Sequence, residues 1–218
     1  MSTAQRRRNG FTLVEVLVAL VIMAIMSLMA WQGVDGIVRS RESNQVRLER
    51  TLRLETVIAQ WEQDLASLQE TGAVPALACD GQNLRLTRRT DDGVQVVIWA
   101  LRPADRGGAV WQRWAGPPVT TTRGLQDSWL RTQQFQGNEL GQLRALTGLE
   151  QWQVYFFQGN AWANCQSTGD VALPTAPKPA AAGTPAATLL PSGVRLVLGF
   201  APDSGLVGNL TRDTLIAP

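Results

Sequence analysis

The sequence predicts an α+β fold, in which a long N-terminal helix crosses a membrane with its first part and then packs on an antiparallel β-sheet. Three observations predict it. An apolar run of membrane length follows a short basic leader, an apolar stripe at helical spacing comes next, and alternating segments between turn residues fill the rest. The 218 residues suffice for one domain with a modest core outside the membrane.

The apolar run extends from Val16 to Trp31 and is preceded by the apolar residues of 11–14. A stretch of about 20 apolar residues spans a ~30 Å hydrocarbon core. Between Phe11 and Val34 the only charged side chain is Glu15. A charge at hydrocarbon depth costs roughly 2.5–3.5 kcal/mol on insertion scales, so Glu15 is interpreted as functional. We expect residues 11–35 to be the membrane-spanning part of the helix.

The helix is predicted to continue through residues 36–72 outside the membrane. Its apolar positions recur at helical spacing, and Gly72 and Pro75 end the pattern. This stripe consists of Leu54, Ile58, Trp61, Leu65 and Leu68. We expect it to pack on the chain's own sheet rather than to form a coiled coil with a partner.

Residues 73–218 are predicted to form a β-rich domain. Turns are expected at Asp91-Asp92-Gly93 and at Gly159-Asn160, both of which favour hairpins. Residues 173–191 are rich in Pro, Ala and Thr and are interpreted as a flexible insertion. The predicted strands are 83–89, 94–101, 109–115, 151–158, 161–165, 193–200 and 211–216.

Composition argues against an enzyme and against a metal or cofactor. The chain has no His, so the commonest general base and metal ligand are missing, and its two Cys are far apart with no C-x-x-C spacing. Two adjacent carboxylates such as Asp91 and Asp92 more often form a solvated turn than a cation site.

The eight Trp are expected mostly in the core, with a partner interface at Trp111 or Trp114 as the alternative. Arg88-Arg89 is interpreted as a solvated strand end.

The positive charge of the chain comes from its leader. Arg6, Arg7 and Arg8 account for three of the twenty basic residues, which leaves seventeen against eighteen acidic ones, a net charge of −1 beyond residue 10. No basic footprint for nucleic acid remains. A basic leader beside a membrane span stays cytoplasmic, so the later residues are expected on the outer side. In an oxidising compartment Cys79 and Cys165 would form a disulfide, and two free thiols are the alternative.

The leader and the start of the apolar run carry a recognisable motif. Three Arg precede Gly10-Phe11-Thr12-Leu13-Val14-Glu15, and the apolar run follows. This pattern resembles the class III signal of type IV prepilins and of type II secretion pseudopilins. A cleaved secretory signal peptide is the nearest rival, but no clear small-x-small site follows the apolar run. A plain single-pass anchor leaves Glu15 unexplained.

The resemblance implies processing. Residues 1–10 would be a leader that a prepilin peptidase removes between Gly10 and Phe11, and the same enzyme would methylate the new amino group of Phe11. In a filament, Glu15 would then pair with the terminal amine of a neighbouring subunit. Pairing two opposite charges in lipid lowers the free-energy cost that each charge would have there alone.

Within this superfamily the chain is most similar to the J-type minor pseudopilins. The similarity is carried by residues 31–35 and 39–42 at the helix exit, by 152–156 and 159–162 in a hairpin, and by Leu190-Pro191-Ser192-Gly193-Val194-Arg195-Leu196. It implies a pilin-like fold and a structural role at the tip of a secretion pseudopilus in the bacterial inner membrane, with a periplasmic domain. The implied partners are I- and K-type minor pseudopilins and the major pseudopilin. A minor type IV pilin in pilus assembly, adhesion or DNA uptake is the alternative.

Overall fold

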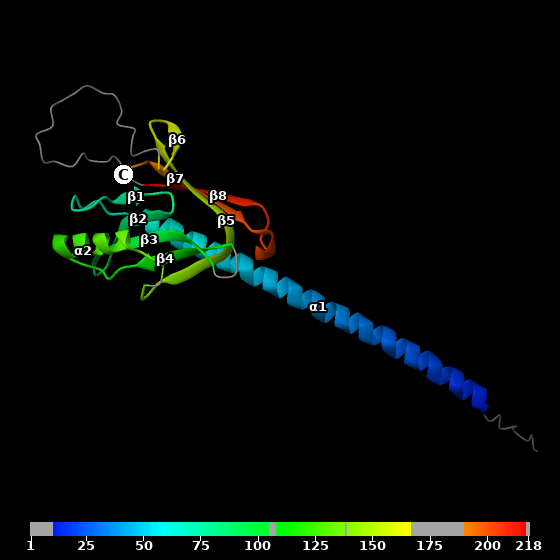
Figure 1. Cartoon of the computed structure of the whole chain (residues 1–218). Coiled ribbons are helices and arrows are strands. Elements are labelled where there is room, and N and C mark those ends of the chain that lie inside the picture. The colour runs from blue at the N-terminus through cyan, green and yellow to red at the C-terminus, as the bar shows by residue number, and fades with distance from the viewer. Residues whose placement is uncertain (1–10, 105–107, 138, 167–189, 217–218) are drawn as a thin grey trace, which may run out of the picture. The chain divides into compact units, whose positions relative to one another are not determined.

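The computed structural model describes residues 11–104, 108–137, 139–166 and 190–216 (Figure 1). Its contacts divide the chain into two compact units, Met1–Glu49 and Arg50–Pro218. The described part of the first unit is almost entirely helical, and the second contains one antiparallel sheet with helices. The predicted α+β class is confirmed. The leader, residues 1–10, and most of the proposed insertion at 173–191 lie outside the described residues.

The helix α1 spans Leu13–Ala66 and continues without interruption past Gly33 and Gly36. It ends earlier than the predicted residue 72. The chain leaves the helix there because its next residues pair with a strand: the Gln69 N–H donates to the Thr87 carbonyl oxygen at 2.9 Å. A tertiary hydrogen bond therefore ends α1 before the Gly and Pro signals do.

The sheet of the second unit is entirely antiparallel, in the order β1-β2-β3-β4-β5-β7-β8, and β6 pairs with β5 outside this path. Each predicted strand is present, with ends shifted by a few residues in some cases and with β5 extended at its start. The strands are β1 Leu77–Cys79, β2 Asn83–Thr90, β3 Gly93–Pro103, β4 Ala109–Ala115, β5 Leu143–Gln158, β6 Ala161–Asn164, β7 Gly193–Phe200 and β8 Asn209–Leu215. At the β5–β6 turn, Gly159 and Asn160 both have positive φ, as this tight hairpin requires.

The core lies between the second-unit part of α1 and one face of the sheet. Ile58, Trp61 and Leu65 are buried there, and Leu54 and Leu68 pack against the same cluster. The prediction that this stripe packs on its own domain is confirmed. Indole rings pack together at the centre of this core. The ring centroid of Trp61 lies 5.5 Å from that of Trp99 and 5.4 Å from that of Trp111. Trp111 and Trp114 are both buried within the chain, as expected for core residues.

Three elements were not predicted. They are the short edge strand β1, the helix α2, Thr122–Gln133, and the one-turn 3₁₀ helix η2, Pro202–Ser204. Thr121 caps α2 by accepting a hydrogen bond from the Gly124 N–H, and Leu125 and Trp129 pack with Val96 of β3. This second, smaller core covers the face of the sheet opposite α1, since Val96 and Val97 are adjacent in β3 and point to opposite faces.

Candidate assembly site

The first turn of α1 is closed by Thr12 and Glu15. The Thr12 N–H and the Thr12 hydroxyl each donate to a Glu15 carboxylate oxygen at 3.0 Å, and the Glu15 N–H donates to the Thr12 hydroxyl oxygen at 3.3 Å. This is a capping box, in which two side chains accept hydrogen bonds from backbone N–H groups that have no partner within the helix. It also places the carboxylate at the helix N-terminus, where the macrodipole favours a negative charge. The spacing Thr-x-x-Glu at Thr12 and Glu15 is the sequence signal for this capping role, which the motif alone does not reveal.

The apolar surface around this carboxylate is uncovered. The N-terminal part of α1 has the length and hydropathy needed to cross a membrane, and none of its most apolar window is buried. Phe11 is 88% exposed and precedes the helix. Such a surface requires lipid or other apolar helices around it. Phe11 and Glu15 are thus brought to one end of the helix, while Gly10 lies outside the described residues.

In the second unit, α1 is tied to the sheet through a buried carboxylate that sequence reasoning missed. Asp64 is fully buried. Its two oxygens accept from the Arg113 guanidinium at 2.7 and 2.9 Å, from Arg88 at 2.5 Å and from the Trp99 indole N–H at 2.9 Å. Because a buried charge is stable only when paired and hydrogen-bonded, this cluster fixes the position of α1 on β2, β3 and β4.

The interpretation of Arg88-Arg89 as a solvated strand end is wrong for Arg88. Its side chain is mostly buried and pairs with Asp64, whereas Arg89 is exposed. Alternation along β2 explains the difference, since neighbouring side chains point to opposite faces of the sheet. Arg53 adds a second tie, donating to the carbonyl oxygens of Arg144 at 2.7 Å and Ala145 at 3.0 Å.

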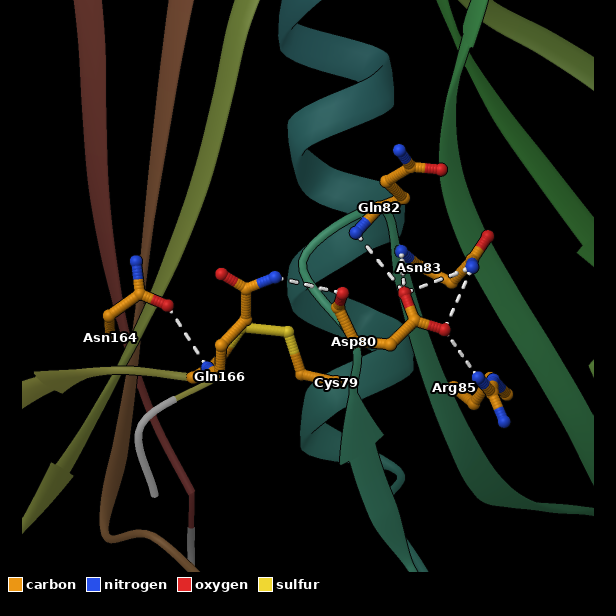
Figure 2. Close-up of a disulfide and its surroundings, with 8 residues drawn as sticks. Cys79, Asp80, Gln82, Asn83, Arg85, Asn164 and Gln166 are labelled. Carbon is orange, nitrogen blue, oxygen red and sulfur yellow. Dashed lines mark hydrogen bonds and ion pairs between the residues drawn. A yellow bond between two sulfur atoms is a disulfide. The ribbon is translucent and has the colours of Figure 1, made fainter. Parts of the chain in front are cut away.

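The structure joins Cys79 and Cys165 by a disulfide, with Cα atoms 5.7 Å apart (Figure 2). Cys79 ends the edge strand β1, and Cys165 follows β6, which branches from β5 near the other side of the sheet. The link therefore connects strands that are distant in the sheet order, so the sheet must curl around α1 to bring them together.

A polar turn lies beside the disulfide. Asp80 accepts hydrogen bonds from the backbone N–H groups of Gln82 and Asn83 and pairs with Arg85, while the Gln166 amide donates to the Asp80 carbonyl oxygen at 2.9 Å (Figure 2). Partial burial alone would raise the pKa of Asp80, but the hydrogen bonds from Asn83 and Arg85 outweigh it and hold the pKa below its ordinary value. The charged form of Asp80 is thus the one that orders this turn.

No group of three or more potential metal ligands is found among the residues that the structure describes. Asp91 and Asp92 are exposed in the turn between β2 and β3. Their arrangement fits a solvated turn.

Comparison with known proteins finds matches both to the N-terminal motif and to most of the rest of the chain. Residues 5–31 match the family model of the prokaryotic N-terminal methylation motif. The chain is 29% identical over 183 residues to type II secretion system protein J of Vibrio cholerae serotype O1, covering 74% of this chain and 76% of that protein. The first match confirms the N-terminal motif, and the second confirms the expected similarity to a J-type minor pseudopilin.

Among solved structures, the chain is similar to a chain of the GspK–GspI–GspJ complex of the type 2 secretion system from enterotoxigenic Escherichia coli. The identity is 12% and the TM-score 0.47, with 78% of this chain and 98% of that chain covered.

Proposed function

We propose that this chain is a J-type minor pseudopilin, a structural subunit at the tip of the pseudopilus that supports export of folded proteins through a type II secretion system. The observation that carries the proposal is the methylation motif at residues 5–31 together with similarity to protein J across most of the chain. The chain is a single-pass protein of the bacterial inner membrane, with its N-terminus cytoplasmic and its C-terminal domain periplasmic. Its role is structural rather than catalytic.

Processing forms part of this proposal. A prepilin peptidase cuts between Gly10 and Phe11 and methylates Phe11. The capping box leaves Glu15 one turn from the new amine, so the carboxylate lies where a neighbouring subunit's terminal amine would neutralise it in the lipid. The partners are the I- and K-type minor pseudopilins and the major pseudopilin.

Secretion provides the test of function. A strain without this chain is expected to retain type II substrates in the periplasm, and the wild-type chain is expected to restore their release. Mass spectrometry of the restored protein should find a chain that begins at methylated Phe11. Normal secretion without the chain, or a protein beginning at Met1 or Ser2 beside an active prepilin peptidase, would refute the proposal.

A further inference from the structure

The two edges of the sheet differ. At one edge, β1 is only three residues long and ends in the disulfide cysteine Cys79. At the other, β8 has seven residues, contains neither Pro nor Lys, and exposes most of its side chains. Within the described parts of the chain, no strand pairs with the outer side of β8. Proteins usually protect an edge of this length, because its unpaired N–H and C=O groups recruit other strands.

Hydrogen bonds at both ends of β8 show which of its backbone groups face away from β7. The Ile216 N–H donates to the Ser192 carbonyl oxygen at 3.0 Å, and the Phe200 N–H donates to the Gly208 carbonyl oxygen at 3.3 Å. In the β7–β8 register, the even-numbered residues of β8 therefore bond to β7. The backbone groups that face outward belong to Asn209, Thr211, Asp213 and Leu215.

Charged side chains on an edge normally repel an incoming strand, but those of β8 are already paired. Arg212 forms an ion pair with Glu62 of α1. The Arg195 guanidinium donates twice to the Asp213 carboxylate, with both distances 2.7 Å. An added strand would therefore not have to neutralise either charge, although a like charge placed directly opposite would still be unfavourable.

We propose that the outer edge of β8 receives an extended strand from a neighbouring, non-identical subunit of the same assembly. The inference rests on the proposed function and specifies the surface through which a partner binds. Main-chain hydrogen bonds from the outward groups of β8 provide the attachment, and the sheet continues into the partner.

A second copy of this chain fits the same edge poorly. Two β8 strands paired about a twofold axis with full overlap would centre on Arg212 and place it opposite the Arg212 of the second copy. Shifting the centre by one residue toward the C-terminus places Asp213 opposite its own copy, while shifting it the other way centres the pair on Thr211 and shortens the overlap to residues 209–213. Like charges directly opposite each other are destabilising across antiparallel strands. A different chain can pair along the whole of β8 without meeting a like charge.

The test uses a proline at a position whose N–H faces outward. Thr211→Pro in the full-length chain removes one edge donor and adds bulk there, without removing a hydrogen bond to β7. Thr211→Val is the matched control, because it keeps the N–H and the β-branched shape. Both variants are co-produced with the neighbouring pseudopilins and purified from detergent-solubilised membranes. We expect Thr211→Pro to recover about tenfold less partner, equivalent to about 1.4 kcal/mol, and Thr211→Val to match the wild type.

Correct folding of Thr211→Pro is checked by the mobility of the disulfide-bonded form on non-reducing gels. Should the proline variant fail to fold, a photo-crosslinking benzoylphenylalanine at position 211 of the otherwise wild-type chain decides. An adduct with another pseudopilin supports the inference, while an adduct with a second copy, or none with any pseudopilin, overturns it.

The edge inference and the proposed function fail differently. Equal partner recovery by wild type, Thr211→Pro and Thr211→Val would overturn the β8 edge and leave the function intact. A wild-type chain that recovers no pseudopilin and is not needed for secretion would overturn both.

Discussion

At the residue scale, Asp64 carries the largest expected effect on stability. It is fully buried and shared by two Arg side chains and an indole N–H. Asp64→Asn should lower the free energy of unfolding by about 3–5 kcal/mol, because removing one partner leaves the guanidinium groups buried and uncompensated. Glu62→Gln, which breaks the exposed pair with Arg212, is the control and should have a much smaller effect. Urea unfolding of the full chain in detergent, followed by Trp fluorescence, measures both. Equal midpoints for the two variants would contradict this role of Asp64.

Glu15 is predicted to matter for assembly and not for insertion. Glu15→Ala should insert at least as well as the wild type, since it removes a cost of roughly 2.5–3.5 kcal/mol, yet it should be lost from the pseudopilin complex. Glu15→Gln retains a hydrogen-bonding side chain at the first turn without the charge, so it separates capping from charge pairing. Membrane fractionation and co-purification provide the measurements. Normal incorporation of both variants would show that the charge is dispensable.

Sequence patterns predicted Glu15 but not Asp64, for a physical reason. Glu15 is a charged residue within a long apolar run, so the free-energy cost of placing its charge in lipid can be recognised from the sequence alone. Asp64 lies beside Leu65 on an ordinary amphipathic helix, and its partners Arg88 and Arg113 are 24 and 49 residues away. Pairing over such separations depends on strand register, which local periodicity does not specify.

At the scale of elements, the disulfide is predicted to hold the curled sheet closed. The double variant Cys79→Ser, Cys165→Ser should be destabilised by about 2–5 kcal/mol, because the bond spans 86 residues and restricts the unfolded chain. The loss of amide protection should be largest in β1 and β6. Hydrogen exchange and thiol labelling of protein from the periplasmic side are the measurements. Two freely labelled thiols in the native protein would exclude the bond.

The turn between β1 and β2 should loosen in acid. The pKa of Asp80 is lower in the folded chain than its ordinary value of 3.8, so its charged form contributes stability at higher pH. This contribution is present above the ordinary pKa and is lost as the pH falls below it through the folded pKa. Hydrogen exchange of the Gln82 and Asn83 amides should therefore lose protection in that range, after correction for intrinsic exchange rates. Asp80→Asn should abolish the pH dependence, and an unchanged profile in this variant would contradict the assignment.

The predicted elements were those with strong local signals. Alternation and turn residues located the long strands, and the Gly159-Asn160 turn was readable because only a few residue types tolerate positive φ. The helix α2 and the short strand β1 were missed. The helix α2 is mostly polar and exposes three of its first five residues, and β1 has only three residues, so neither presents a clear period.

At the scale of the whole molecule, we propose that this chain is one member of a mixed complex. In our proposal, partners bind the exposed apolar helix and the outer edge of β8, which pairs with no strand of the described residues, whereas the residues around Trp61 stabilise the chain's own domain.

The most direct test is purification of the tagged full-length chain from native membranes, with the copy number of each associated protein determined by quantitative mass spectrometry. We expect a chain that begins at methylated Phe11 and is recovered with the I- and K-type minor pseudopilins in comparable amounts. Long filaments built from this chain alone, or recovery without any pseudopilin, would contradict it.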